Sequence, residues 1–205
     1  MKRRISAQKL PAGGKAEAES KLAIQVHRGS NSAFERLVER FEASLFRYSR
    51  NLLQNGPDAE EVVQDAMMRA HRALTVQYDE ARCAALALRP WLFKMVRNLA
   101  SNKRRGKRHQ LERPLEDAGD DATHSIPHQH SNLERKQQSA RLQRAIDALP
   151  VEARELIVLR FMEEMSYAEI SRTIRATEAS LRGKVFRSVA LLRQTLEQEG
   201  VTHAL

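Results

Sequence analysis

The sequence predicts an all-α protein of two small helical domains joined by a flexible linker. Long stretches repeat apolar residues at i, i+3, i+4 and i+7, which is the period of a helix rather than a strand. Helix breakers are few, with 8 glycines and 6 prolines among 205 residues. The period is lost between Arg105 and Leu133, in a stretch too polar to bury a core. We therefore expect a disordered tail at 1–20, a first domain at 21–108, a linker at 109–132 and a second domain at 133–200.

In the first domain, one helix is predicted over about 32–54, because Ser32 and Glu35 have the spacing of a capping box ahead of an apolar stripe. The segment Asn55-Gly56-Pro57 stops this helix. Asp58 starts a second helix, whose apolar positions continue to Leu74.

The next stretch, 76–89, loses the helical period and predicts a loop. Pro90 suits the first turn of a third helix because proline fits a position whose N–H lacks an intrahelical partner. The predicted inner side of this helix carries Trp91, Leu92, Met95, Val96 and Leu99.

In the second domain, helical periodicity runs from Leu142 to Phe161 with a break at Pro150. Ser166 and Glu169 then form a predicted capping box ahead of a short helix. A longer helix starts near Thr177, and its inner side carries Leu181, Val185, Val189, Leu192 and Leu196. A short helix, a tight connection and a longer helix are typical of a helix-turn-helix.

The charge and composition of the chain limit the classes of function that it can have. Lys and Arg exceed Asp and Glu by 35 − 26 = 9, so polyanions such as nucleic acid should attract the chain. The longest apolar run, Cys83–Leu88, is far shorter than the roughly 20 residues that span a bilayer. The N-terminus lacks the apolar core of a secretory signal, and a lone cysteine forms no internal disulfide. We expect a cytoplasmic protein with no membrane insertion and no cofactor.

The third helix carries a polar face, formed by Lys94, Asn98, Asn102 and Arg105 at spacings of four, four and three. Five positive charges follow within 103–108. Amides hydrogen-bond to base edges, whereas lysines mostly contact phosphate, so this face is a candidate for nucleic-acid binding. The alternative is a solvated helix end whose cations complement the helix dipole.

The last helix presents Arg182, Gly183, Phe186 and Arg187 away from its apolar side. Phe186 could rest on a thymine methyl in the major groove while the arginines contact guanine or phosphate. Glycine lacks a side chain and would let the backbone approach DNA closely. In the alternative interpretation, Phe186 packs against a neighbouring helix.

The start of the second helix is acidic, through Asp58, Glu60, Glu61 and Asp65. Because DNA would be repelled by these charges, a basic protein surface is the expected partner. The alternative is that the acids only complement the positive end of the helix dipole.

Four segments together resemble the extracytoplasmic-function (ECF) group of bacterial RNA polymerase sigma factors. Asp58–Leu74 (DAEEVVQDAMMRAHRAL) and Leu88–Arg105 (LRPWLFKMVRNLASNKRR) resemble helices of the family's second region. Leu149–Ile174 and Ser180–Gln194 (SLRGKVFRSVALLRQ) resemble its fourth region. The order and spacing of the segments also match those of the family.

This resemblance implies a non-catalytic specificity subunit that binds core RNA polymerase and recognises two promoter elements in DNA. The implied minus-10 contacts are Tyr78, Lys94, Asn98, Asn102 and Arg105, with the loop at 78–88 receiving an unstacked base. The implied minus-35 contacts are Ser180, Arg182, Gly183, Phe186 and Arg187. The implied polymerase contacts are Asp58, Glu61, Val62, Gln64 and Asp65 for the beta-prime coiled coil, and Leu156 and Leu159 for the beta flap. Family members are often held by an anti-sigma factor, which is a further expected partner.

The chain departs from the family where Arg175 replaces the usual glycine in the turn, and where Gly183 replaces a serine or similar residue.

A helix-turn-helix regulator that is not a polymerase subunit is the alternative function. It leaves the polar third helix and the acidic helix unexplained. A nucleic-acid enzyme is a further alternative, but the sequence offers no Gly-rich phosphate loop or Cys-x-x-Cys pair. A metal site at His124, His128 and His130 is disfavoured by Pro127 and the lack of a nearby cysteine or fourth ligand.

Overall fold

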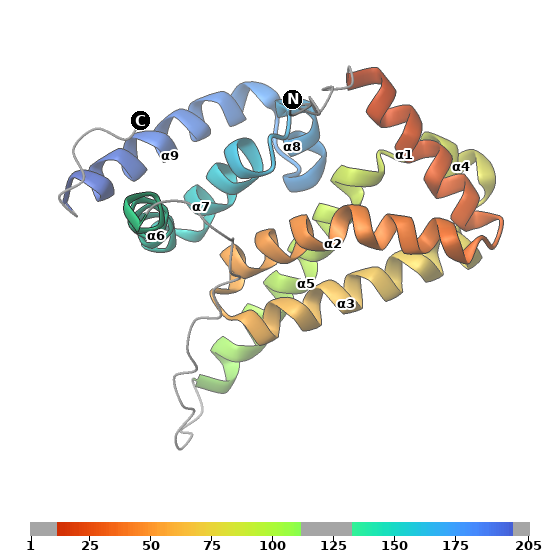
Figure 1. The fold of residues 1–205 in the computed structure, drawn as a ribbon, viewed down its shortest axis with the longest axis horizontal. Coiled ribbons are helices and arrows are strands. Elements are labelled where there is room, and N and C mark those ends of the chain that lie inside the picture. The colour runs from red at the N-terminus through yellow and green to blue at the C-terminus, as the bar shows by residue number, and fades with distance from the viewer. Residues whose placement is uncertain (1–11, 112–132, 199–205) are drawn as a thin grey trace, which may run out of the picture.

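The computed structural model describes residues 12–111 and 133–198, and no strand occurs within these ranges. The first domain consists of α1 (Ala12–His27), α2 (Asn31–Leu53), α3 (Gly56–Arg72), the π-helical turn η1 (Ala73–Gln77), α4 (Glu80–Ala85) and α5 (Leu88–Leu111). The second consists of α6 (Leu133–Asp147), α7 (Val151–Ile157), the π-helical turn η2 (Val158–Met162), α8 (Tyr167–Ile174) and α9 (Glu178–Gln198). The all-α class and the two helical domains are therefore confirmed (Figure 1).

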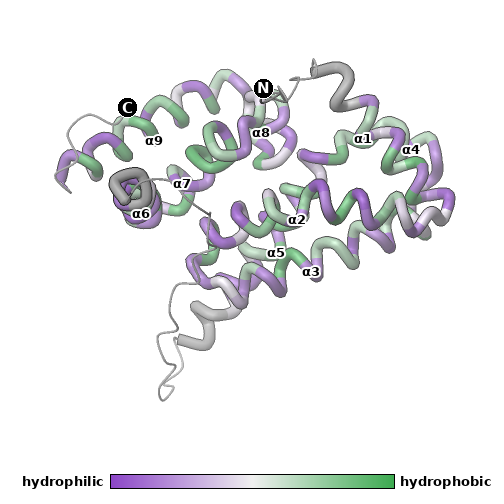
Figure 2. The backbone as a smooth tube through the Cα atoms, in the orientation of Figure 1, coloured by the Kyte–Doolittle hydropathy of each residue, from purple (hydrophilic) through white to green (hydrophobic). Residues whose placement is uncertain are grey.

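The first domain is built on α2, α3 and α5, which pack against one another, with α1 and α4 together at one end (Figure 1). Apolar and polar residues alternate around the helices with the helical period, as the hydropathy colouring in Figure 2 shows. Fully buried side chains of this core include Leu37, Leu45, Tyr48, Leu74 and Leu92. Within the described ranges, no helix has the length and apolar character needed to cross a membrane.

The caps of α2 and α3 correct the predicted starts of these helices. The hydroxyl of Ser30, and not that of Ser32, accepts the N–H of Ala33 at 3.3 Å and begins α2. The amide oxygen of Asn55 accepts the N–H of Asp58 at 2.9 Å and begins α3 two residues before the predicted start. Either serine fits the pattern of a capping residue, so only the backbone geometry distinguishes them.

Two segments that were expected to lack structure contain helices. α1 begins at Ala12, inside the stretch expected to be a tail, and buries Leu22, Ala23 and Val26. α4 lies inside the predicted loop, with the carboxylate of Asp79 accepting the N–H of Arg82 at its start. Residues 1–11, most of the predicted linker and the last residues of the second domain lie outside the described ranges.

The second domain contains the predicted helix-turn-helix. The capping box at the start of α8 is confirmed: Ser166 Oγ accepts the N–H of Glu169, and the carboxylate of Glu169 accepts the N–H of Ser166 at 2.8 Å. Arg175 ends α8 in the left-handed conformation, with φ 57° and ψ 51°. Arginine therefore adopts here the conformation that glycine adopts most readily.

Each domain continues one helix as a π-helical turn, which accommodates one extra residue in the helical register. In η1 the N–H of Tyr78 donates to the carbonyl of Ala73 at 2.9 Å. In η2 the N–H of Glu163 donates to the carbonyl of Val158, also at 2.9 Å. These turns set the directions in which Tyr78 and Glu163 leave their helices.

The two domains also pack on one another, which the sequence did not predict. α7 and η2 contact α2, and α8 contacts α5. The buried apolar side chains of the two domains form one continuous cluster. Phe93 belongs to this cluster and is fully buried, although it was not assigned to the inner side of α5.

Candidate nucleic-acid and polymerase interfaces

The polar face of α5 is open to solvent. Asn98, Asn102 and Arg105 are exposed, and Lys94 is half-buried. The guanidinium of Arg105 donates to the amide oxygen of Asn102, so these two side chains form one polar unit. Trp91 and Met95, which were expected on the inner side, are only half-buried, and their spacing of seven residues from Asn98 and Asn102 places them on this same side of α5. The arrangement offers amides for base edges and cations for phosphates on a single helix.

Tyr78 lies at the end of η1, next to the start of α5. Its ring packs on that of Trp91, with centroids 5.9 Å apart, and the guanidinium of Arg82 in α4 lies 3.9 Å from its centroid. Tyr78 is half-buried, so part of the ring is accessible. Sequence reasoning missed Arg82 because it treated this stretch as a loop. Stacked aromatic and guanidinium groups are suited to receive an unstacked base.

Cys83 lies on the inner side of α4 and is fully buried. Burial raises the pKa of the Cys83 thiol, and the carboxylates of Asp79 and Glu80 raise it further. A thiol with a raised pKa forms little thiolate at neutral pH. Cys83 is therefore a packing residue of the buried core. The histidines considered for a metal site, His124, His128 and His130, lie outside the described residues.

The outer face of α9 carries the predicted minus-35 residues. Ser180, Arg182, Phe186 and Arg187 are exposed, and Phe186 has 76% of its surface accessible. The alternative in which Phe186 packs against a neighbouring helix is therefore wrong. An aromatic side chain this exposed, between two arginines, forms a surface suited to the major groove.

Two neighbours shape this face. The guanidinium of Arg182 lies 4.8 Å from the ring centroid of Tyr167 at the start of α8, and Arg160 lies 5.2 Å from the same ring. A Cβ added at Gly183 would lie 3.6 Å from the guanidinium of Arg187, which is ordinary van der Waals contact. Helix packing does not require glycine at this position. Tyr167 was missed because it precedes the helix that was analysed for DNA contacts.

The acidic start of α3 is partly neutralised from within the domain. Lys103 of α5 donates to the carboxylate of Glu61 and lies 3.3 Å from that of Asp58. Partial burial acts to lower the pKa of Lys103, but the hydrogen bonds to Glu61 and Asp58 outweigh it and raise the pKa. Asp65 pairs with Arg69 at 2.8 Å. The predicted polymerase surface and the polar helix α5 are thus joined by one cation.

Three of the predicted polymerase contacts are almost entirely buried. Val62, Leu156 and Leu159 are buried in the core, so in this conformation they support the surface from beneath. Glu61 and Gln64 are exposed, and Asp58 and Asp65 are partly exposed. A groove of about 280 Å³ lies between α7 and α9. Its lining includes the apolar side chains of Ala153, Leu156 and Leu191 and, on α9, the cations Lys184 and Arg187. This groove is the accessible apolar feature near the predicted flap contact.

The fold and these surfaces define a two-domain helical protein in which each domain has a helix with an exposed face that carries cationic side chains, α5 in the first and α9 in the second. Residues 37–110 match the family model of sigma-70 region 2, and residues 139–192 match that of sigma-70 region 4. The chain is 30% identical over 187 residues to the ECF RNA polymerase sigma factor SigM of Mycobacterium tuberculosis, covering 90% of this chain and 88% of that protein. It is 26% identical over 188 residues to the RNA polymerase sigma-H factor of Pseudomonas aeruginosa, covering 88% and 95%. The chain belongs to the ECF sigma factors.

Solved structures share this fold. The sigma factor RpoE of Bartonella quintana, in complex with the anti-sigma factor NepR, superposes with a TM-score of 0.63 at 22% identity. That match covers 80% of this chain and 96% of RpoE. CnrH, in complex with the cytosolic domain of CnrY, also has a TM-score of 0.63, at 24% identity, and covers 89% of this chain and 99% of CnrH.

Proposed function

We propose that this chain is a dissociable, non-catalytic subunit that binds core RNA polymerase and gives it promoter specificity in the cytoplasm. The observation that carries the proposal is the pairing of two separate nucleic-acid-facing helices, α5 and α9, with an acidic helix, α3, that DNA would repel. A helix-turn-helix regulator needs only the second domain for DNA. It leaves the exposed amides of α5 and the acidic surface of α3 without a role.

In this proposal, α5 binds the minus-10 element as a separated strand. Asn98 and Asn102 contact base edges, while Lys94 and Arg105 contact phosphates. An unstacked base enters beside Tyr78, and its stacking on the aromatic ring offsets an unstacking cost of a few kcal/mol. The exposure of the amides and the accessible part of the Tyr78 ring support these roles.

The minus-35 element binds as a duplex on α9. Arg182 and Arg187 contact guanine or phosphate, Phe186 contacts a thymine methyl, and Ser180 contacts the backbone at the helix start. Gly183 lets the backbone of α9 approach the groove. The support for these roles is the common exposure of the four side chains on one face of α9.

Core polymerase binds at two places. Asp58, Glu61, Gln64 and Asp65 on α3 contact the beta-prime coiled coil, and the groove between α7 and α9 accepts an apolar element of the beta flap. An anti-sigma factor, of the kind found in the RpoE complex, would compete for these surfaces.

Equilibrium binding to purified core polymerase tests the proposal, together with run-off transcription in the presence and absence of the chain. We expect tight binding to core and promoter-specific transcripts only when the chain is added. Equal transcripts with and without the chain would reject the function. An ordinary helix-turn-helix regulator would bind DNA specifically without core.

The docking surface is tested by the double charge reversal Glu61→Lys with Asp65→Lys. Exposed ion pairs contribute about 0.2–1 kcal/mol each, and reversal adds repulsion, so core affinity should fall roughly tenfold. The matched control is Glu35→Lys with Glu39→Lys, two exposed acids with the same i, i+4 spacing on α2. Equal loss in both variants would remove α3 from the polymerase surface.

A further inference from the structure

α1 contacts both of the segments that flank Tyr78, the π-helical turn η1 before it and α4 after it. Nδ1 of His27 donates to the carbonyl of Leu74 in η1 at 2.9 Å. The hydroxyl of Ser20 donates to the carbonyl of Ala84 in α4 at 2.7 Å. One helix therefore holds the backbone on both sides of the residue that we propose receives an unstacked base.

α4 is bound to α1 and to the residue after it at both of its ends. Arg28, which directly follows α1, donates to the carboxylate of Glu80 through two nitrogens, Nε at 3.0 Å and Nη2 at 2.6 Å. Glu80 is the first residue of α4, and Ala84, whose carbonyl accepts the Ser20 hydroxyl, is the fifth. Isolated helices shorter than about 12–15 residues are at best marginally stable, and α4 has 6 residues. The position of α4 therefore depends on these contacts and on its contact with the core.

Arg82 lies on the opposite side of α4 from these contacts. At about 100° per residue, Glu80 and Ala84 share one side of the helix, and Arg82 lies about 180° from the middle of that side. The Arg82 guanidinium lies 3.9 Å from the ring centroid of Tyr78. Its side chain is exposed, so the N–H groups at the edge of the guanidinium can donate to a base while its plane covers the ring. The contacts with α1 thus determine, through α4, where Arg82 lies on the Tyr78 ring.

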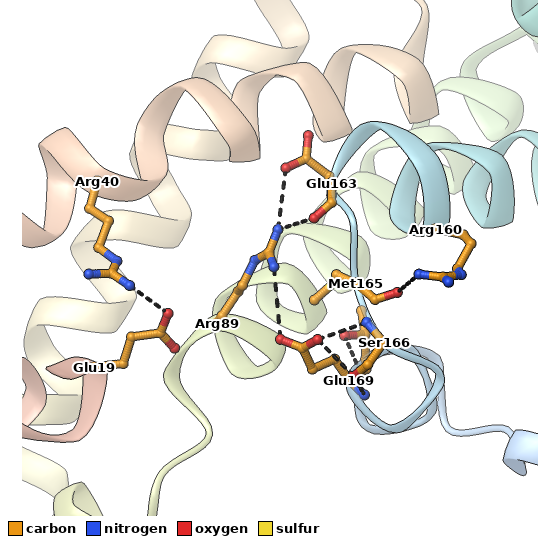
Figure 3. Close-up of polar contacts among 9 residues, drawn as sticks. Glu19, Arg40, Arg89, Arg160, Glu163, Met165, Ser166 and Glu169 are labelled. Carbon is orange, nitrogen blue, oxygen red and sulfur yellow. Dashed lines mark hydrogen bonds and ion pairs between the residues drawn. The ribbon is translucent and has the colours of Figure 1, made fainter. Parts of the chain in front are cut away.

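α1 is itself fixed to α2. The carboxylate of Glu19 in α1 accepts Nη2 of Arg40 in α2 at 3.0 Å (Figure 3). The amide oxygen of Gln25 accepts Nη2 of Arg36, also in α2, at 2.8 Å. The buried side of α1 comprises Leu22, Ala23 and Val26. Polar contacts therefore connect α2 to α1 and α1 to α4, over an apolar core.

We propose that Ser20 and Arg28 are positioning residues for the selection of one base in the minus-10 element. They hold α4 so that the guanidinium of Arg82 stays on the Tyr78 ring, with its N–H donors at the edge of the base site. A guanidinium in a fixed position distinguishes bases by where their acceptor atoms lie, whereas a mobile one does so less. The inference rests on the proposed function, because that function supplies the base. α1 precedes residues 37–110, which match the model of sigma-70 region 2.

The fluorescence of Trp91 tests the positioning in the free chain. Trp91 is the only tryptophan in the sequence, it is half-buried, and its ring centroid lies 5.9 Å from that of Tyr78. The double variant Ser20→Ala with Arg28→Ala removes the contacts at the two ends of α4. We expect acrylamide to quench Trp91 more strongly in this variant than in wild type, because α4 no longer holds Arg82 over the neighbouring ring.

The matched control is Lys21→Ala. It removes one positive charge from α1, as Arg28→Ala does from the residue after α1, but its ion pair with Glu17 at 2.6 Å lies within α1. The conservative variant is Arg28→Lys, which keeps the charge but donates without the planar fork of arginine. We expect wild-type quenching for Lys21→Ala, and quenching between that of wild type and of the double variant for Arg28→Lys.

Binding of the chain and core polymerase together to forked promoter DNA tests base selection. 2-Aminopurine fluorescence locates the unstacked position with the wild-type chain, and each of the four bases is then placed there. The preference for the best base should fall about threefold in the double variant, because one exposed ion pair and one hydrogen bond contribute modestly. Affinity for minus-35 duplex should not change. A loss of stability alone would weaken binding of all four bases alike.

A double variant that keeps the wild-type base preference would overturn the proposal. So would equal quenching of Trp91 in the double variant, in Lys21→Ala and in wild type. If the chain does not bind core at all, the proposed function fails and base selection fails with it. The quenching of Trp91 in the free chain then still decides whether Ser20 and Arg28 hold α4 in place.

Discussion

The two helices that we propose bind nucleic acid, α5 and α9, differ in how much of their surface the protein covers. α5 is covered by both domains, since it contacts α2 and α3 of the first domain and α8 of the second. Its Leu92, Phe93 and Val96 side chains are buried, and Phe93 packs on Tyr48 of α2. α9 is covered on one side by α6, α7 and α8, and its outer face carries an exposed phenylalanine, Phe186.

This difference suits two different tasks. A helix that enters the major groove needs an open outer face, which α9 has. A helix that binds a separated strand can instead serve as the wall of a binding surface, with neighbouring groups such as Tyr78 and Arg82 supplying the pocket. Of the two helices, α5 is therefore the one whose sequence is more constrained by packing.

The largest expected effect comes from replacing one phenylalanine in each helix, Phe93 in α5 and Phe186 in α9. Phe93→Ala should destabilise the chain by about 3–5 kcal/mol, because it removes a fully buried ring that packs on Tyr48. Phe186→Ala should change stability by less than about 0.5 kcal/mol and weaken binding to a site with thymine more than to one with uracil. Thermal melting and DNA binding measure the two effects. Equal loss of stability in both variants would contradict the difference between the helices.

The next effect concerns the arginines of α9. Arg187→Ala should cost about 1–3 kcal/mol of DNA binding and relax the preference at one base pair if Arg187 contacts a guanine. If it contacts only phosphate, all sequences should weaken alike and the salt slope should fall by about one. Arg193→Ala, at an exposed position six residues further along α9, is the control. Binding titrations at several salt concentrations separate these outcomes.

A smaller effect compares one glycine in each helix. Gly106→Ala in α5 and Gly183→Ala in α9 should each stabilise the chain by about 1 kcal/mol, because neither added Cβ meets a close neighbour. Only Gly183→Ala should weaken binding to minus-35 DNA, since glycine there is proposed to allow close approach. Melting curves and duplex binding test the pair. Unchanged duplex affinity for Gly183→Ala would mean that the backbone does not approach DNA closely.

The smallest expected effect concerns the stability of the turn before α9. Arg175→Gly should stabilise the second domain by about 0.5 kcal/mol, because relief of the left-handed strain at φ 57° is partly offset by the greater freedom of glycine in the unfolded chain. Arg172→Gly, at an exposed position inside α8, should instead destabilise by about 1 kcal/mol. Chemical denaturation of the full chain measures both.

Much of the fold could be predicted because each long helix carries its own apolar stripe and its own stop. α2, α3, α5, α8 and α9 were all expected from this local pattern, and the Ser166–Glu169 capping box was predicted with both of its residues. α1 and α4, which contact each other, were missed. α4 spans only Glu80–Ala85, which is too short for periodicity to identify.

The candidate site could be predicted where a side chain faces away from its own helix's core, as with Asn98, Asn102 and Phe186. The candidate site could not be predicted where contacts between residues far apart in the sequence determine the position of a side chain. The pairing of Lys103 with Glu61 joins residues 42 positions apart, and no local pattern indicates it. Glu155 and Arg97 similarly read as surface charges until the two domains are brought together.

The π-helical turn η2 has a consequence for sequence variation in this family. A single-residue deletion within Val158–Met162 would convert η2 to regular α-helix and leave the direction of the chain after it nearly unchanged, because the π-helical turn takes up one residue more than an α-helical turn. The deletion would leave α7 intact and keep Glu163 near Arg47. Insertions and deletions of one residue at this position are therefore changes that related chains could accommodate while keeping the contact between their two halves.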